Sequence, residues 1–274
     1  MGGGEVTESR GADVSVGSGR RIAFSIASGV FAAGAFGGLF GLGLVIGWFD
    51  GSEGGIHRVH DVGFGVVYGI ILTVAFAAMT WRADRRISAL YQIAGTAAAA
   101  LIAALASADA RYLVFGLAVA TAAAILLALH PTRAEVLRPA ANPSPALAAL
   151  AFVGSVPLVW FGLTMARLQR TGLPADPHVQ MDHWATMAAM AFGLALTGLL
   201  ASARLRGWRL TAWCAGLGAA TYGLASMVFH RFPGTSVPYP GSEGIDWGAA
   251  AVAGGLVFLA AAEWVARRSP AFIG

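Results

Sequence analysis

The chain has 274 residues, of which 57% are hydrophobic and only 12% are charged, and its mean hydropathy is +0.68. A soluble domain carries about 25% charged residues, so this composition predicts an integral membrane protein. The formal net charge is +4, and all 18 basic residues are arginines, because the sequence contains no lysine. We attribute this charge to arginines at membrane edges and expect no nucleic-acid partner; the lack of lysine also excludes a lysine nucleophile.

Residues 1–21 are predicted to form a flexible, polar tail on the cytoplasmic side of the membrane. This tail is rich in glycine, serine and glutamate, and no short apolar core follows a basic start, so we expect no cleavable signal there. Further along the chain, Cys214 is the only cysteine and falls inside an apolar run. An intrachain disulfide and a cysteine-based metal site or haem attachment are therefore excluded.

Eight apolar runs are long enough to cross a bilayer, since a membrane-spanning helix needs about 20 largely apolar residues. We therefore expect an all-α fold, a polytopic membrane helix bundle with eight transmembrane spans. The predicted spans are Ile26–Trp48, Asp61–Trp81, Ile87–Ala106, Tyr112–His130, Ala146–Ala166, His183–Ala203, Trp208–Phe229 and Trp247–Ala266. Near the inner end of the last span, Glu263 is expected to pair with Arg267, four residues later on the same helix face.

The distribution of arginine predicts the orientation of the bundle. Of the 18 arginines, 13 fall on one side of the eight predicted spans and five on the other. Short cytoplasmic loops are enriched in basic residues, so both termini are predicted to be cytoplasmic, in a multi-pass protein of the plasma membrane. On this topology, five of the six histidines and eight of the 14 carboxylates lie on the outer side.

A recurring offset of 121 residues suggests that the chain contains two related halves, 22–140 and 141–274. The second and sixth predicted spans end 121 residues apart, at Trp81 and near residue 202, and the third and seventh begin with the same offset. Four spans per half would give parallel repeats related by an axis along the membrane normal. Span positions also coincide by chance, so a four-plus-four repeat and an unrelated run of eight helices both stay open.

The pattern His-x-x-x-Asp occurs twice with this same offset, first at His57 and Asp61 and again at His178 and Asp182. Each copy stands where a polar loop meets an apolar run. Residues four apart share one face of a helix, so the histidine and the aspartate of each copy can both point inward. If the halves are repeats, the two copies meet near the outer membrane surface.

Imidazole together with carboxylate suits a divalent transition metal such as zinc, iron or copper. Haem is disfavoured, because a membrane cytochrome places its histidines deeper and in pairs on partner helices. An alternative role for the two aspartates is to cap helix N-termini, where a carboxylate meets unpaired N–H groups. The candidate catalytic residues are Asp61 and Asp182, and the candidate metal ligands are His57, His60, His178, His183 and His230.

Three functions remain open from the sequence, and whether the protein is an enzyme is among the open points. The first is a metal-dependent enzyme that acts on a lipid or another hydrophobic substrate in contact with membrane lipids. The second is a non-catalytic subunit or scaffold of a larger membrane complex. The third is a permease for a small solute or a metal, which is disfavoured because the middles of the predicted spans lack Asp, Glu, Arg and His.

Overall fold

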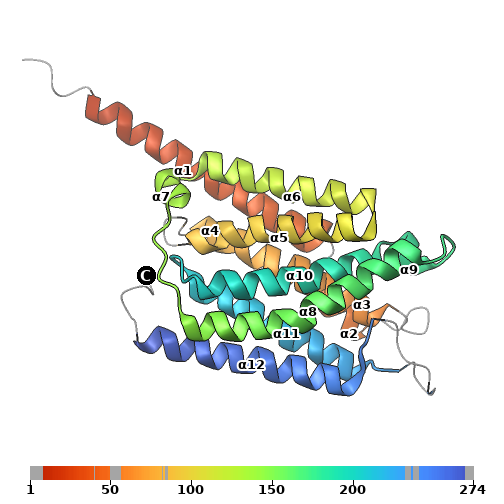
Figure 1. Ribbon diagram of the computed structural model, residues 1–274. Coiled ribbons are helices and arrows are strands. Elements are labelled where there is room, and N and C mark those ends of the chain that lie inside the picture. Colours follow the sequence, from red (N-terminus) through yellow and green to blue (C-terminus); the bar gives the residue numbers. More distant parts are fainter. Residues whose placement is uncertain are drawn as a thin grey trace, which may run out of the picture.

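The computed structural model describes residues 9–39, 41–49, 57–81, 83, 86–231, 236 and 241–268. Every element within these residues is a helix, and the long helices run side by side along a common direction (Figure 1). The elements are α1 (Ser9–Ala33), η1 (Gly34–Gly38), α2 (Gly43–Phe49), α3 (Arg58–Phe64), η3 (Gly65–Thr73), α4 (Val74–Trp81), α5 (Ile87–Ser107), α6 (Ala110–Leu129), α7 (Arg133–Leu137), α8 (Pro145–Thr171), α9 (Pro177–Gln180), α10 (His183–Ser202), α11 (Trp208–Val228) and α12 (Gly244–Arg268).

Seven helical segments are long and apolar enough to cross a membrane, which confirms the all-helical prediction and supports seven of the eight predicted spans. The remaining predicted span is helical as α11, and its 21 residues are long enough, but α11 is not among the helices with sufficient hydropathy. The eighth span and the internal repeat stay predictions. The seven segments are Ser18–Phe49, Arg58–Trp81, Ile87–Ser107, Ala110–Leu129, Pro145–Thr171, His183–Ser202 and Gly244–Arg268.

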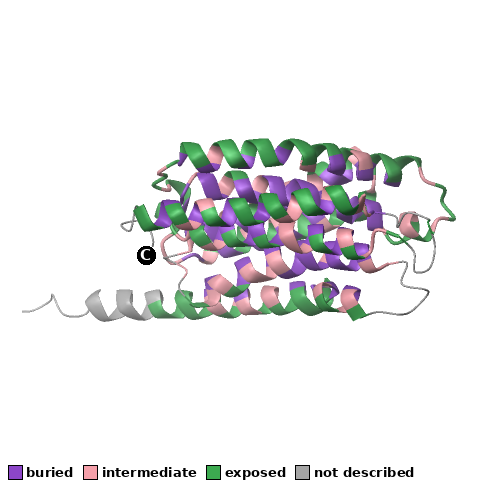
Figure 2. Cartoon of the chain, turned by 90° about the horizontal axis from the view of Figure 1, so that it is seen from below, coloured by how far each residue is buried: buried purple, intermediate pink, exposed green. Residues whose placement is uncertain are grey.

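Helix α10 is the most buried of the candidate spans and helices α1, α6, α8 and α12 are the least buried. Figure 2 shows buried residues gathered in the middle of the bundle and exposed residues on its outer helices. In the most apolar stretch of α10, 83% of the residues are buried, against 22% in α8 and 28% in α6. The outer helices therefore expose large apolar side chains, among them Phe152, Trp160 and Leu163 on α8. A helix that is apolar on its exposed side fits a lipid environment.

Glycines bring the segment from α3 to α4 close to the first helical segment. A Cβ atom on Gly65 would collide with the backbone of Leu44, and one on Gly69 would lie 2.9 Å from the carbonyl oxygen of Gly41. Small residues four apart allow helix backbones to approach closely in membranes. This contact fixes the position of α3, whose beginning carries two of the candidate site residues.

At the opposite end of the bundle, Glu263 on α12 pairs with Arg209 on α11. Nε of Arg209 donates to the carboxylate at 2.6 Å, a second guanidinium nitrogen donates to the other oxygen, and Nε1 of Trp213 donates at 2.8 Å. The hydrogen-bonded partner of Glu263 is therefore Arg209 on the neighbouring helix, whereas the expected Arg267 on α12 acts on this carboxylate only through its charge.

Candidate metal centre

Four histidines from two distant parts of the chain converge at one end of the bundle. His57 and His60 stand at the beginning of α3, His178 lies on α9, and His183 opens α10 (Figure 1). Each offers one ring nitrogen, and these four atoms lie within 4.8 Å of one another. The ring centroids are 4.8 Å apart for His57 and His183 and 4.9 Å apart for His60 and His178. The predicted convergence of four imidazoles is therefore present.

The four-histidine group is largely shielded from solvent. His60 is fully buried and His183 is 6% exposed, whereas His57 and His178 are half-buried. The ring of Trp184 stands edge-on to that of His60, with centroids 5.0 Å apart. On another side, a Cβ atom built on Gly241 would lie 2.9 Å from Nε2 of His60, so only glycine fits that close approach, and its φ of +78° also favours glycine.

Asp176 orients the ring of His178. One oxygen of its carboxylate accepts a hydrogen bond from Nδ1 at 3.0 Å and another from the backbone N–H of His178 at 2.9 Å, which caps α9. Burial acts to raise the pKa of Asp176, but these hydrogen bonds outweigh it and hold the pKa below its ordinary value. Asp176 is therefore a carboxylate, and it leaves Nε2 of His178 as the nitrogen available to a metal.

Asp176 had no predicted role, although the order Asp-Pro-His in the sequence contains a local signal for one. An aspartate followed by proline is typical of a helix start, with the aspartate as N-cap and the proline in the first turn. The same cap brings the carboxylate to the imidazole two residues later. A carboxylate that holds the far nitrogen of a histidine is a common companion of metal sites.

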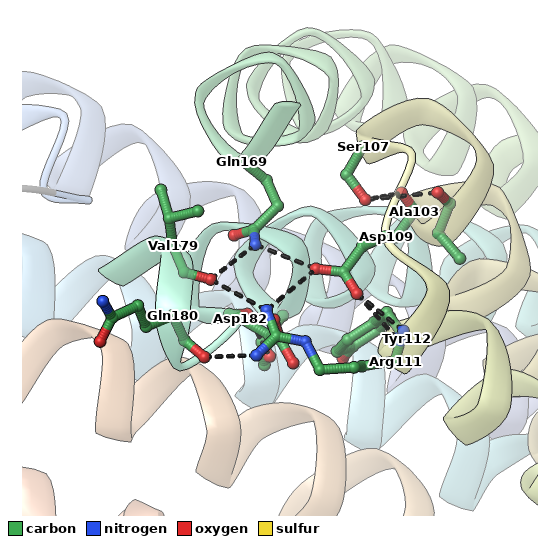
Figure 3. A network of polar contacts seen from close by, with 11 residues as sticks. Ala103, Ser107, Asp109, Arg111, Tyr112, Gln169, Val179, Gln180 and Asp182 are labelled. Atoms are coloured by element: carbon green, nitrogen blue, oxygen red, sulfur yellow. Dashed lines mark hydrogen bonds and ion pairs between the residues drawn. The ribbon is translucent and has the colours of Figure 1, made fainter. Parts of the chain in front are cut away.

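The two candidate catalytic aspartates do not belong to the four-histidine group. Asp182 pairs with Arg111, and Figure 3 shows both side chains beside Asp109. Burial and the neighbouring Asp109 raise the pKa of Asp182 to about 7, against the opposing effect of Arg111. Asp61 is 7% exposed and its Cβ lies close to Gly47 of α2. A catalytic role for either residue stays a prediction.

The alternative role of these aspartates as helix caps also differs from the structure. Asp182 occupies the N-cap position of α10, but its side chain accepts no capping hydrogen bond, because it is turned toward Arg111. The N-cap of α3 is His57, and Asp61 lies in the first turn. The carboxylates that do cap helices here are Asp109 on α6 and Asp176 on α9.

The fifth candidate ligand, His230, is not part of the group. Its Nδ1 lies 2.9 Å from the carbonyl oxygen of Met227, one turn back at the end of α11. The predicted outer loop that follows His230 lies mostly outside the described residues, including 232–235 and 237–240. A metal-binding role for His230 therefore stays a prediction, and the four-histidine group offers four ligand atoms without it.

No protein-family model, curated protein or solved structure matches this chain. The chemistry of the site is accordingly the main guide to function. Among the described residues, the group contains four imidazoles and no carboxylate. Imidazole ligands suit zinc, copper, iron and nickel, whereas magnesium and calcium take oxygen ligands, so the donor set fits a divalent transition metal.

Proposed function

We propose that this protein is a membrane metalloprotein that binds one divalent transition-metal ion through His57, His60, His178 and His183. The observation that carries the proposal is the convergence of four ring nitrogens within 4.8 Å. Nε2 of His178 and Nδ1 of His183 are buried without a hydrogen-bond partner among the described residues. A buried polar atom without a partner is costly, and a bound metal ion would satisfy both.

The proposal is tested by elemental analysis of the purified full-length protein, prepared without chelator. We expect close to one transition-metal ion per chain in the wild type and almost none in the double variant His57→Ala/His178→Ala, which lacks one ligand from each part of the chain. The matched control is His230→Ala, which removes a histidine outside the group and is expected to keep the metal. Equal metal content in the wild type and the double variant contradicts the proposal.

We further propose that the metal centre serves an enzyme acting on a lipid or another hydrophobic substrate. An apolar cleft of about 270 Å³ between α8, α10, α11 and α12 supports this. The cleft reaches Trp247, whose ring stacks on Phe161 with centroids 5.8 Å apart, and Phe161 in turn contacts Tyr222. The Tyr222 hydroxyl donates to the carbonyl of Gly241, the residue that packs on His60.

Three aromatic rings in contact, those of Trp247, Phe161 and Tyr222, thus connect the lining of the cleft with Gly241, and we propose that a hydrocarbon chain in the cleft has its polar end on the side of the metal site. A metal ion there would act as a Lewis acid on a carbonyl or phosphoryl oxygen. His57 and His178 are the more exposed of the four histidines, so water entering the site would come from their side. With four imidazole ligands, turnover requires a fifth position at the ion for the substrate oxygen, and a site without such a position would be structural, as in a scaffold.

Turnover separates these two functions. We expect the metal-loaded wild type to convert at least one of the phospholipids, acylglycerols or isoprenoid lipids offered in mixed micelles, with products detected by mass spectrometry. Gly154→Leu is expected to fill the cleft and abolish turnover while metal content is unchanged, because a Cβ at Gly154 meets nothing within 4 Å. The control Gly95→Leu also adds its side chain in open space, but on α5, away from the cleft. Bound metal without turnover of any lipid favours the scaffold.

A further inference from the structure

Arg111, at the start of α6, binds the segment 176–183, which carries two of the four histidines, through hydrogen bonds and an ion pair. Its two terminal guanidinium nitrogens donate to the carbonyl oxygens of Gln180, at 2.5 Å, and Val179, at 3.1 Å. The same guanidinium pairs with the carboxylate of Asp182 (Figure 3). One side chain therefore contacts three residues between His178 and His183, namely the backbone of Val179 and Gln180 and the side chain of Asp182.

Two neighbouring side chains hold Arg111 and the segment in place. Asp109 accepts hydrogen bonds from the backbone N–H groups of Arg111 and Tyr112, at 2.9 and 3.2 Å, and so caps α6. Nε2 of Gln169, at the end of α8, donates to the other oxygen of Asp109 at 3.0 Å and to the carbonyl of Val179 at 2.9 Å. The segment is thereby tied to both the α5–α6 turn and α8.

The segment needs such support because its backbone is in an unfavourable conformation. Asp182 has φ of +57°, in the left-handed region that residues other than glycine rarely adopt. Only Met181 and Asp182 separate α9 from α10, so this conformation decides how the ring of His178 faces that of His183. Arg111 therefore contacts the turn at the residue whose backbone conformation is least favourable.

We propose that Arg111 is a positioning residue of the metal centre, which it serves by fixing the segment that presents His178 and His183. This inference rests on the proposed metal site and adds a residue that never touches the ion. It also gives Asp182 a role, because the carboxylate of Asp182 is one of the groups through which Arg111 holds the segment. Residues that orient metal ligands from outside the ligand set typically change metal affinity by about 10- to 100-fold.

The test is the affinity of the purified full-length protein for Zn²⁺ alone, measured by competition with a chromogenic chelator. We expect Arg111→Gln to weaken binding by about 10-fold or more. Arg111→Lys keeps the charge but not the planar pair of donors and is expected to recover only part of the loss. Arg170→Gln is the matched control, because Arg170 is exposed at the end of α8 on the same side of the bundle, and its affinity is expected to be that of the wild type.

A second measurement separates positioning from a general loss of stability. In the background His183→Ala, which keeps three of the imidazoles, Arg111→Gln is expected to have a smaller further effect on Zn²⁺ affinity, whereas in His57→Ala its full effect persists. A loss of similar size in both backgrounds overturns the inference. If Arg111→Gln does not fold, Gln169→Met removes one donor to Val179 and is expected to give a smaller loss with the same dependence on background.

The outcomes for the two proposals are distinct. Wild-type protein that binds Zn²⁺ as tightly as Arg111→Gln leaves the metal site standing and overturns the role of Arg111. Wild-type protein that binds no metal overturns both. Weaker binding in Arg111→Gln, with unchanged binding in Arg170→Gln and the expected dependence on the histidine background, supports both.

Discussion

At the scale of single residues, metal binding depends on which ring nitrogen of each histidine faces the ion. His178 is the clearest case, since Asp176 accepts the hydrogen bond of Nδ1 at 3.0 Å and leaves Nε2 toward the other rings. The carboxylate also makes the imidazole a stronger donor to a positive ion. Asp176 thus links a local helix cap to the chemistry of the whole group.

Asp176→Asn separates these two contributions of Asp176. Asparagine still caps a helix, so we expect little change in thermal stability of the metal-free protein. It carries no negative charge to polarise the imidazole, and we expect metal affinity to fall by about 10-fold. Competition with a chelator measures the affinity. A loss of stability without a loss of affinity would show that Asp176 acts only as a cap.

The raised pKa of Asp182 predicts how the stability of the protein depends on pH. Burial and Asp109 raise its pKa to about 7 from an ordinary value of 3.8, so the folded protein binds this proton more tightly than the unfolded chain. The contribution of Asp182 to stability is therefore fully present below about pH 4 and is lost as the pH rises through about 7. We expect Asp182→Asn to flatten the decline in melting temperature between about pH 5 and about pH 8, measured with chelator present. An identical slope in both proteins would rule this out.

At the scale of helices, close glycine contacts decide how tightly the elements pack. On α11, a Cβ atom added at Gly223 would lie 2.6 Å from the carbonyl of Gly248 and 2.9 Å from the backbone nitrogen of Val252, both on α12. Backbone atoms cannot rotate away as a side chain can. The α11–α12 contact therefore tolerates no added volume at this point. Helix α11 packs this closely even though its hydropathy is too low for it to count among the candidate membrane spans.

Gly223→Ala tests this contact. We expect it to destabilise the protein by about 1–3 kcal/mol, the usual cost of overpacking. Gly254→Ala on α12 is the control, because a Cβ there meets nothing within 4 Å, and alanine in a helix is expected to stabilise by about 0.5–1 kcal/mol. Thermal unfolding in detergent gives both values. Equal effects of the two substitutions would contradict the close approach of α11 and α12.

Hydropathy alone predicts the positions of most helices, because an apolar run and a buried or lipid-facing helix nearly coincide. The predicted run Ile87–Ala106 and helix α5 differ by one residue at one end. Hydropathy does not predict the polar ends of helices. Helix α8 continues five residues beyond Ala166 and so includes Gln169, whose side chain donates to the carbonyl of Val179 in the segment 176–183. The π-helix η3 was not predictable either, since the carbonyl of Ile71 is satisfied by Gln92 from another helix.

The candidate site divides in the same way. Two histidine pairs at matching helix entries predict a cluster, and His57, His60, His178 and His183 do converge. Asp182 was expected to join these rings, but its carboxylate pairs with Arg111 instead. Arg111 lies 71 residues away in sequence, and no local sequence pattern predicts that contact. Long-range ion pairs of this kind are set by the packing of whole helices.

At the scale of the whole molecule, the predicted orientation places the four histidines on the outer side of the membrane. Labelling of single cysteines tests this in a Cys214→Ala background, since Cys214 is the only native cysteine. We expect Leu173→Cys, on the exposed turn after α8, to react with an impermeant maleimide in intact cells, and Arg138→Cys only after lysis. The reverse pattern would place the histidines on the cytoplasmic side.

The proposed metal centre holds one metal ion through four imidazoles, two from each distant part of the chain. X-ray absorption spectroscopy of the zinc-loaded full-length protein tests it most directly, because multiple scattering from imidazole rings counts the histidine ligands. We predict a shell of nitrogen ligands at about 2.0–2.1 Å with four imidazoles and no sulfur, reduced to three imidazoles in His57→Ala. A first shell made mainly of carboxylate or water oxygen in the wild type would contradict the account.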